Sequence, residues 1–147
     1  MGPGAGRDAP RAGGVASLIA FVDTNVLVRH LVADPPEQAR RATAALADAE
    51  RLLVTDVVFA ECVFVLESFY EAPREQVATA MRALLALPSV VVNDAPVLLR
   101  ALEVYELDGL HFAEAQLVAA AEASGVGRVL SFDKALKRAT SIEWWQP

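Results

Sequence analysis

The chain has 147 residues, of which 54% are hydrophobic and 22% charged, and its formal net charge is −6. This length and composition predict one folded domain. The acidic balance argues against a protein that binds nucleic acid through a broadly basic surface, so such binding would need local arginines, a bound cation or a partner protein. No apolar run approaches the ~20 residues of a membrane-spanning helix, which predicts a soluble chain with no membrane partner.

Residues 1–17 contain five of the eight glycines and almost no large apolar side chain, which predicts a disordered leader ahead of a single domain over residues 18–147. The one cysteine, Cys62, excludes an internal disulfide bond and favours a reducing compartment such as the cytoplasm. Because Cys62 lies in an apolar run, we expect a packed thiol rather than a nucleophile. His30 and His111 are too few for a zinc site, so both are expected to be structural or surface residues.

Short apolar runs alternate with stretches of helical periodicity along the rest of the chain. The predicted strands are Ile19–Val22, Leu52–Val54, Val90–Val92, Arg128–Phe132 and Ile142–Trp145. The predicted helices are Val26–Val32, Glu37–Glu50, Val57–Tyr70, Pro73–Leu87, Pro96–Glu106, His111–Ala123 and the short basic Lys134–Arg138. This alternation predicts an α/β fold, a three-layer sandwich in which helices flank both faces of a central, mainly parallel sheet of about four to five strands.

The first predicted strand, Ile19–Val22, is entirely apolar and is expected to be buried on both faces. Asp23 follows it directly and would lie at the carboxyl end of the strand, the edge where open parallel sheets bind ligands. Thr24 and Asn25 suit the cap of the next helix, because their side-chain oxygens can accept a hydrogen bond from an unpaired backbone N–H. Asp23 could equally be that cap, and this stretch alone leaves both interpretations open.

Three further acids stand in notable positions. Glu61 is the only charged residue in the apolar run between Asp56 and Glu67, so its helix is expected to be largely buried. A lone carboxylate there is costly unless it is paired, protonated or bound to a metal. Glu114 is set among alanines in a later helix, and Asp133 ends the fourth strand.

These acids are expected to converge, because strand ends of one polarity meet at one edge of a parallel sheet. Four carboxylates without matching cations would repel one another, and a divalent ion would relieve that repulsion. Oxygen ligands with hardly any histidine favour Mg²⁺ or Mn²⁺ over zinc. Acid clusters of this kind hold ions that activate water in phosphodiester cleavage.

Four segments, one around each acid, resemble the acidic motifs of the PIN-domain ribonucleases, and among these the VapC-type toxins of type II toxin–antitoxin modules. In chain order they are FVDTNVLVR, VVFAECVFVL, HFAEAQLVAAAEASG and VLSFDKALKR, and the resemblance extends from Leu18 to Trp144. It implies a PIN-like, Rossmann-like fold. The family usually has aspartate in the third motif, where this chain has Glu114, whose extra methylene could shift a bound metal. Asp108 is a possible substitute, or else a turn or cap residue.

The resemblance implies an endoribonuclease that cleaves single-stranded or structured RNA with water activated by Mg²⁺ or Mn²⁺. The ions would be held by Asp23, Glu61, Glu114 and Asp133. The side chains that would orient the carboxylates or the phosphate are Thr24, Asn25 and Ser131. The candidate RNA phosphate contacts, for which a solvated surface is the alternative, are Arg29, Lys134, Lys137 and Arg138. The same resemblance implies a homodimer and a cognate antitoxin protein as partner.

Two other functions stay open. If Glu114 has weakened the metal site, the chain would be a PIN-fold binding module with little or no catalysis. A phospho-acceptor receiver domain also gathers acids at the edge of a parallel sheet, and Lys134 loosely matches its lysine after a late strand. A receiver, however, needs adjacent acids near the first strand, where this chain has only Asp23, and it leaves Glu61 unexplained.

Overall fold

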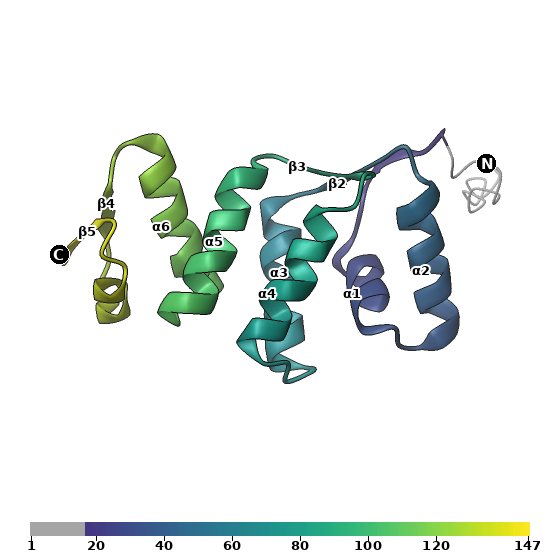
Figure 1. Ribbon diagram of the computed structural model, residues 1–147, viewed down its shortest axis with the longest axis horizontal. Coiled ribbons are helices and arrows are strands. Elements are labelled where there is room, and N and C mark those ends of the chain that lie inside the picture. The colour runs from purple at the N-terminus through teal and green to yellow at the C-terminus, as the bar shows by residue number, and fades with distance from the viewer. Residues whose placement is uncertain (1–16) are drawn as a thin grey trace, which may run out of the picture.

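The computed structural model describes residues 17–147, so the predicted leader lies outside the described residues apart from Ser17. The strands are β1 (Ile19–Phe21), β2 (Arg51–Val54), β3 (Val90–Val92), β4 (Arg128–Leu130) and β5 (Glu143–Trp145). The helices are α1 (Thr24–Val32), α2 (Pro36–Asp48), α3 (Asp56–Ser68), α4 (Arg74–Leu85), α5 (Ala95–Asp108), α6 (Phe112–Ser124) and the 3₁₀ helix η2 (Lys134–Arg138). Every predicted element is present, and the α/β class is confirmed (Figure 1).

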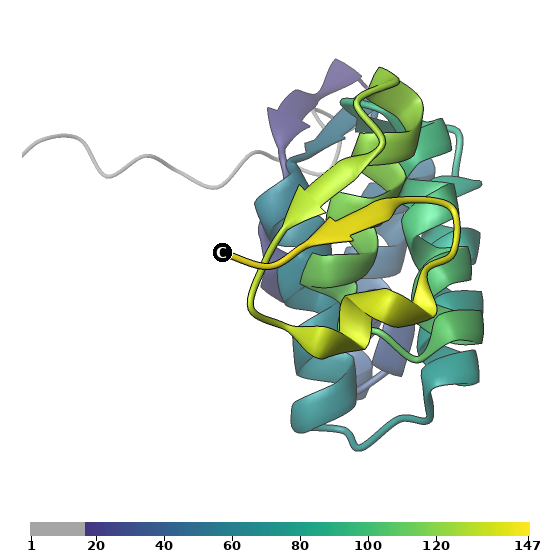
Figure 2. The ribbon, with the colours of Figure 1, turned by 90° about the vertical axis from the view of Figure 1, so that its left-hand side faces the viewer.

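The strands form two separate parallel sheets. The first has the order β1-β2-β3, and the second consists of β4 paired with β5. The prediction of a single sheet with about four to five strands is therefore wrong. In Figure 1 the second sheet lies at the opposite end of the long axis from β1, beyond α5 and α6, and Figure 2 shows it in front of α6.

The turn between α6 and β4 explains this separation. Gly125 and Gly127 adopt positive φ angles of 77° and 64°, which glycine reaches without the steric cost of a Cβ, and the Gly127 N–H donates to the Ala121 carbonyl at 2.9 Å. The chain therefore reverses at once, and β4 packs against the helix that precedes it. Val129 of β4 and Leu136 of η2 are both buried in the core, so the second sheet stays with α6.

Helices cover one face of the first sheet, and the other face is exposed. Phe21 lies opposite Leu53, and Leu53 lies opposite Val91, so the three side chains form one row across the sheet. Phe21 is 72% exposed, and Ile19 on the same face is 56% exposed. The expectation that β1 is buried on both faces is therefore wrong, because within residues 17–147 no element packs on this outer side.

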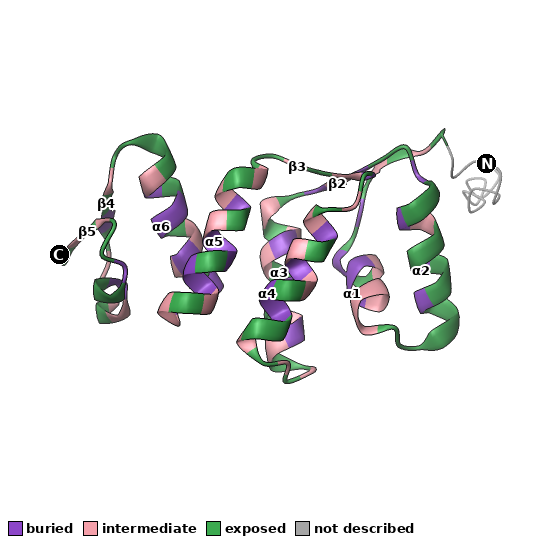
Figure 3. Ribbon diagram, viewed as in Figure 1, coloured by how far each residue is buried: buried purple, intermediate pink, exposed green. Residues whose placement is uncertain are grey.

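The core lies between the helices. Buried residues, purple in Figure 3, occupy the faces that the helices turn toward one another. Phe59 and Cys62 of α3 and Tyr105 of α5 are fully buried. The start of α3 is fixed by Thr55, whose side chain accepts a hydrogen bond from the Val58 N–H at 3.2 Å. None of the helices in the described range has the length and apolar character needed to cross a membrane.

Helix α3 supplies a matched pair of phenylalanines for testing this core. Phe59 is fully buried and its ring centroid lies 5.6 Å from that of Phe112, whereas Phe64 on the same helix is 64% exposed. We expect Phe59→Ala to lower the free energy of unfolding by about 3–5 kcal/mol, because it leaves a cavity. Phe64→Ala should change it by about 0.5 kcal/mol or less. Urea denaturation measures both, and equal losses would contradict this packing of α3.

Candidate functional site

The carboxylates of Asp23 and Glu61 are joined through Thr24 at the start of α1. Asp23 follows β1 and is the N-cap of α1, where its Oδ1 accepts a hydrogen bond from the Thr24 N–H at 2.9 Å. The Thr24 hydroxyl donates to Oε2 of Glu61 at 3.0 Å, across 37 positions of sequence. Thr24 itself is only 4% exposed. An almost fully buried threonine therefore brings two of the four predicted acids to one place.

Both acids keep an oxygen that could bind a ligand. Within residues 17–147, Oδ2 of Asp23 and Oε1 of Glu61 accept no hydrogen bond, and both residues are exposed. Glu61 is thus not the buried carboxylate that the sequence predicted, because one side of α3 faces solvent. Since the cap uses only one oxygen of Asp23, the capping role and a ligand-binding role are compatible.

The thiol of Cys62, next to Glu61 on α3, is affected by burial and by the negative charges of Asp23 and Glu61. Its side chain is fully buried, and that burial is the main reason why its pKa is raised. The charges of Glu61 and Asp23 act in the same direction, and together these effects raise the pKa of the thiol to about 12. The thiol is therefore protonated at neutral pH, and the prediction of a packed cysteine is confirmed.

Glu114 lies in the first turn of α6, and α6 packs against α3. The packing includes the ring of Phe112, which contacts that of Phe59. Oε2 of Glu114 is buried and has no hydrogen-bond partner in the described part of the chain. Because a buried carboxylate oxygen without a partner is costly, this atom is suited to receive a cation or a water molecule.

Asp133 lies apart from these acids. It caps η2, where its Oδ1 accepts a hydrogen bond from the Ala135 N–H at 2.9 Å, and its own N–H donates to Oγ of Ser131 at 2.9 Å. The segments β4 and η2 occupy the opposite end of the molecule from β1 and α1 (Figures 1 and 2). Among residues 17–147 no three Asp, Glu, His or Cys side chains are arranged to hold a metal ion. The ligand set of four acids therefore stays a prediction.

The predicted phosphate contacts are also divided between the two ends. Arg29 lies on α1, near the acid pair, and its Nε donates to Oε1 of Gln38 on α2 at 2.9 Å. At the other end, Lys137 lies 5.0 Å from the centre of an indole ring on β5, and Arg138 donates to the Gly109 carbonyl at 3.2 Å. Arg29 is thus the predicted cation that shares an element with Thr24.

The remaining predicted residues occupy the surface or have local roles. Asn25 and Lys134 are exposed, and Asp108 is the last residue of α5. Nδ1 of His30 lies 2.8 Å from a threonine hydroxyl of α2, and partial burial lowers the pKa of this histidine. His111 is the N-cap of α6. The prediction that both histidines are structural or surface residues is confirmed.

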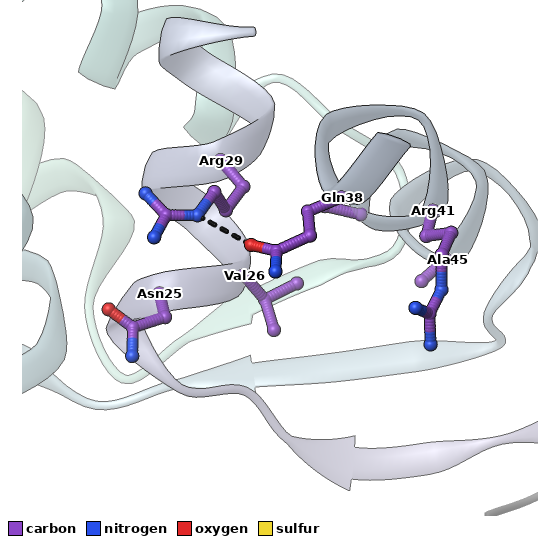
Figure 4. Close-up of a pocket in the computed structure, with 7 residues that line it drawn as sticks. Asn25, Val26, Arg29, Gln38, Arg41 and Ala45 are labelled. Atoms are coloured by element: carbon purple, nitrogen blue, oxygen red, sulfur yellow. Dashed lines mark hydrogen bonds between the residues drawn. The ribbon is translucent and has the colours of Figure 1, made fainter. Parts of the chain in front are cut away.

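Two binding candidates were missed by sequence reasoning. Gln38 and Arg41 of α2 line a pocket together with Asn25 and Arg29 of α1 (Figure 4). In the sequence, both missed residues belong to an Ala- and Arg-rich helix whose pattern is typical of an exposed surface. Only the packing of α1 against α2 brings them next to the residues of α1.

Comparison with known proteins gives a family for this fold. Residues 20–141 match the PIN domain, a span that includes all four predicted acids. Curated proteins gave no match to the chain. The matched span begins in β1 and ends after η2, so it contains both ends of the molecule.

The raised pKa of Cys62 predicts slow reaction with thiol reagents. At pH 8 the thiolate is scarce because the pKa is about 12, and burial also blocks access. We expect Ellman's reagent to label the folded protein at least ~100-fold more slowly than the chain in urea. Since the folded pKa lies above the unfolded one, stability should also fall above about pH 9, where only the unfolded chain ionises. Comparable labelling rates in both states would contradict the described environment of Cys62.

Proposed function

The chain belongs to the PIN domain family, and on this premise we propose that it is a divalent-metal-dependent endoribonuclease, the toxin component of a type II toxin–antitoxin module. PIN domains are typically nucleases and generally use divalent metal ions. The observation that carries the proposal is the pairing of Asp23 and Glu61 through Thr24. The proposed substrate is RNA, single-stranded or structured.

The free atoms of this acid pair fit Mg²⁺ or Mn²⁺ in their chemistry. They are carboxylate oxygens, and Mg²⁺ is usually bound by one or two carboxylates while it keeps several waters. The proposed third ligand is Glu114, on the helix that packs against α3, whose buried oxygen has no partner within residues 17–147. The sulfur of Cys62, next to Glu61, is protonated and buried, which disfavours zinc. A bound ion would lower the pKa of a water molecule and offset the negative charge of a phosphate.

Thr24 positions both acids for this role. Its hydroxyl holds the side chain of Glu61 and its N–H holds that of Asp23, so both carboxylates are oriented before any ligand arrives. The first turn of α1 starts at the same point, and the N–H groups of a helix N-terminus favour a phosphate group. A phosphate bound at this point would therefore lie next to two oriented carboxylates and the N-terminus of α1.

A second copy of the chain would complete the acid set. In the part of the chain that the structure describes, neither β1 nor β4 has a strand on its outer edge. Exposed apolar side chains lie on these strands and on β5, namely Phe21, Leu130 and Trp145. Pairing of β4 from one copy with β1 of another would cover them and bring Asp133 toward Asp23.

A cognate antitoxin is the second proposed partner. PIN domain proteins commonly bind RNA and partner antitoxins. A toxin that cleaves RNA needs a protein that blocks its site, and such a protein needs apolar surface to bind. Phe64 of α3 is 64% exposed and Phe69, the C-cap residue of this helix, is 76% exposed, so both offer such surface.

The alternative function is a PIN-fold binding module with weakened catalysis. Two observations favour it: Glu114 stands where the family usually has aspartate, and η2, which Asp133 caps, lies at the far end of the molecule from α1, which Asp23 caps. In this alternative the acid pair and the pocket beside it would bind RNA without cleaving it. Activity measurements on the parent chain separate the two functions.

The acid pair predicts RNA cleavage that depends on Mg²⁺ and on Asp23. We expect a labelled single-stranded RNA to be cleaved in Mg²⁺, not in EDTA, and at least ~100-fold more slowly by Asp23→Asn. Asp48→Asn, which changes an exposed acid at the end of α2, is the matched control and should cleave like the parent. Mg²⁺ should also raise the melting temperature of the parent and of the control, but not that of Asp23→Asn. Cleavage that persists in EDTA would contradict the proposal.

Glu114→Asp separates the nuclease from the binding module. If Glu114 serves as a ligand, shortening it by one methylene should change the cleavage rate of an already active parent only modestly. Cleavage in Glu114→Asp with none in the parent would instead favour the binding module. The same gel assay reads out both results.

The dimer proposal predicts that one exposed phenylalanine is essential for association. We expect the parent to sediment as a dimer and Phe21→Asp to sediment as a monomer, because the charge would be buried between the strands. Phe69→Asp is the control, since Phe69 is 76% and Phe21 72% exposed, and it should stay dimeric. A monomeric parent at micromolar concentration, or dissociation by Phe69→Asp alone, would show that the proposed interface is wrong.

A further inference from the structure

A pocket of about 600 Å³ lies between α1 and α2 (Figure 4). Its polar side chains are Asn25 and Arg29 from α1 and Gln38 and Arg41 from α2, and Val26 adds apolar surface. Sites for small ligands have volumes of roughly 300–1,000 Å³, are mostly apolar and carry a few polar groups that orient the ligand. This pocket has the volume of such a site, and four of the residues that line it carry polar side chains.

The pocket is a basic site in an acidic protein. Its lining includes two arginines and no acid, although the net charge of the chain is −6. Arg41 forms no ion pair within residues 17–147, whereas its neighbour Arg40 pairs with Glu37 at 2.6 Å. An unpaired guanidinium binds phosphate through parallel hydrogen bonds. The lining therefore favours an anionic ligand.

Arg29 is oriented by its neighbours but is not saturated by them. Its Nε donates to Oε1 of Gln38 at 2.9 Å, and its Nη1 lies 3.5 Å from the Tyr70 hydroxyl. A guanidinium has five N–H donors, so within residues 17–147 most of those of Arg29 have no acceptor, and neither does the NH₂ group of Gln38. A contact of 2.8 Å between His30 and Thr43 also links α1 to α2. The side chains of Arg29 and Gln38 are thus held in place before a ligand binds, which lowers the entropic cost of binding.

The pocket shares α1 with the acid pair. Asn25 follows Thr24 directly, and Arg29 lies six positions after Asp23, about 9 Å further along the helix at ~1.5 Å per residue. A strand of RNA with one phosphate at Asp23 and Glu61 can therefore reach this pocket with a neighbouring nucleotide. The ligand that matches both the charge and the position is a nucleotide of the same RNA.

We propose that this pocket is an RNA subsite that binds the nucleotide next to the cleaved bond, an inference that rests on the proposed nuclease function. Arg29 and Arg41 contact its phosphate, and the amides of Asn25 and Gln38 contact the edge of its base, since amide groups pair with base edges. The apolar surface of Val26 packs against the base. The subsite supplies local positive charge that the chain as a whole lacks.

Two adjacent arginines give a matched test of this subsite. Binding of a short fluorescent single-stranded RNA is measured by anisotropy in EDTA, which prevents cleavage. We expect Arg41→Gln to bind about tenfold more weakly than the parent, with a slope of log affinity against log salt that is smaller by about 0.7. Arg40→Gln, which removes an arginine already paired with Glu37, should bind within about twofold of the parent. Circular dichroism checks that both variants are folded.

The outcomes separate the subsite from the nuclease function. Equal binding by the Arg40 and Arg41 variants, or an RNA that competes no better than an acidic peptide, would overturn the subsite. If the parent cleaves RNA and Arg41→Gln cleaves it with unchanged KM and kcat, the subsite is wrong and the nuclease proposal stands. If the parent does not cleave RNA but binds it in a manner that depends on Arg41, the nuclease proposal is wrong and the pocket stands as an RNA-binding site.

Discussion

The hydrogen bond from the Thr24 hydroxyl to Glu61 is the contact on which the site depends. Thr24 is nearly buried, so its hydroxyl must find an acceptor within the protein. The acceptor comes from α3, and the N–H of the same residue holds Asp23, so one residue fixes α1, α3 and the end of β1 relative to one another. Two negative charges are thereby held close together, and they add to the effect of burial, which is the main cause of the raised pKa of the neighbouring Cys62.

Local structure could be predicted from the sequence because local signals determine it. Apolar runs identified the strands, and the residues that interrupt them identified the helix boundaries, for example Pro35 and Pro36 at the start of α2 and Gly125 after α6. The arrangement of the strands could not be predicted in the same way. The residues of β4 favour a strand but do not specify its neighbour, and the tight turn at Gly125 and Gly127 keeps β4 beside α6 rather than β1. The single sheet expected from the alternation of elements was therefore wrong.

The candidate site, like the fold, could be predicted only as far as local signals determine it. Asp23 was expected at the end of a strand and Glu61 near the start of the helix that follows the next strand, and in a parallel pair these positions meet, as β1 and β2 show. Asp133 follows a strand that pairs elsewhere, so its position could not be inferred from the end of its own strand. Gln38 and Arg41 carried no signal at all, because an exposed arginine on an Ala-rich helix has the same local pattern whether or not a second helix forms a pocket with it.

Helix α1 lies beside two centres of opposite charge. Its start holds two carboxylates, and its middle presents Arg29 toward a pocket that also contains Arg41. A phosphate is repelled by the first centre and attracted by the second, so RNA should first engage the arginines. On the proposed function, a second phosphate would become stable at Asp23 and Glu61 only when a divalent cation offsets the two carboxylates. The electrostatics of α1 would then couple cation binding to the position of RNA, and would direct an anionic polymer toward an acidic site of a chain with a net charge of −6.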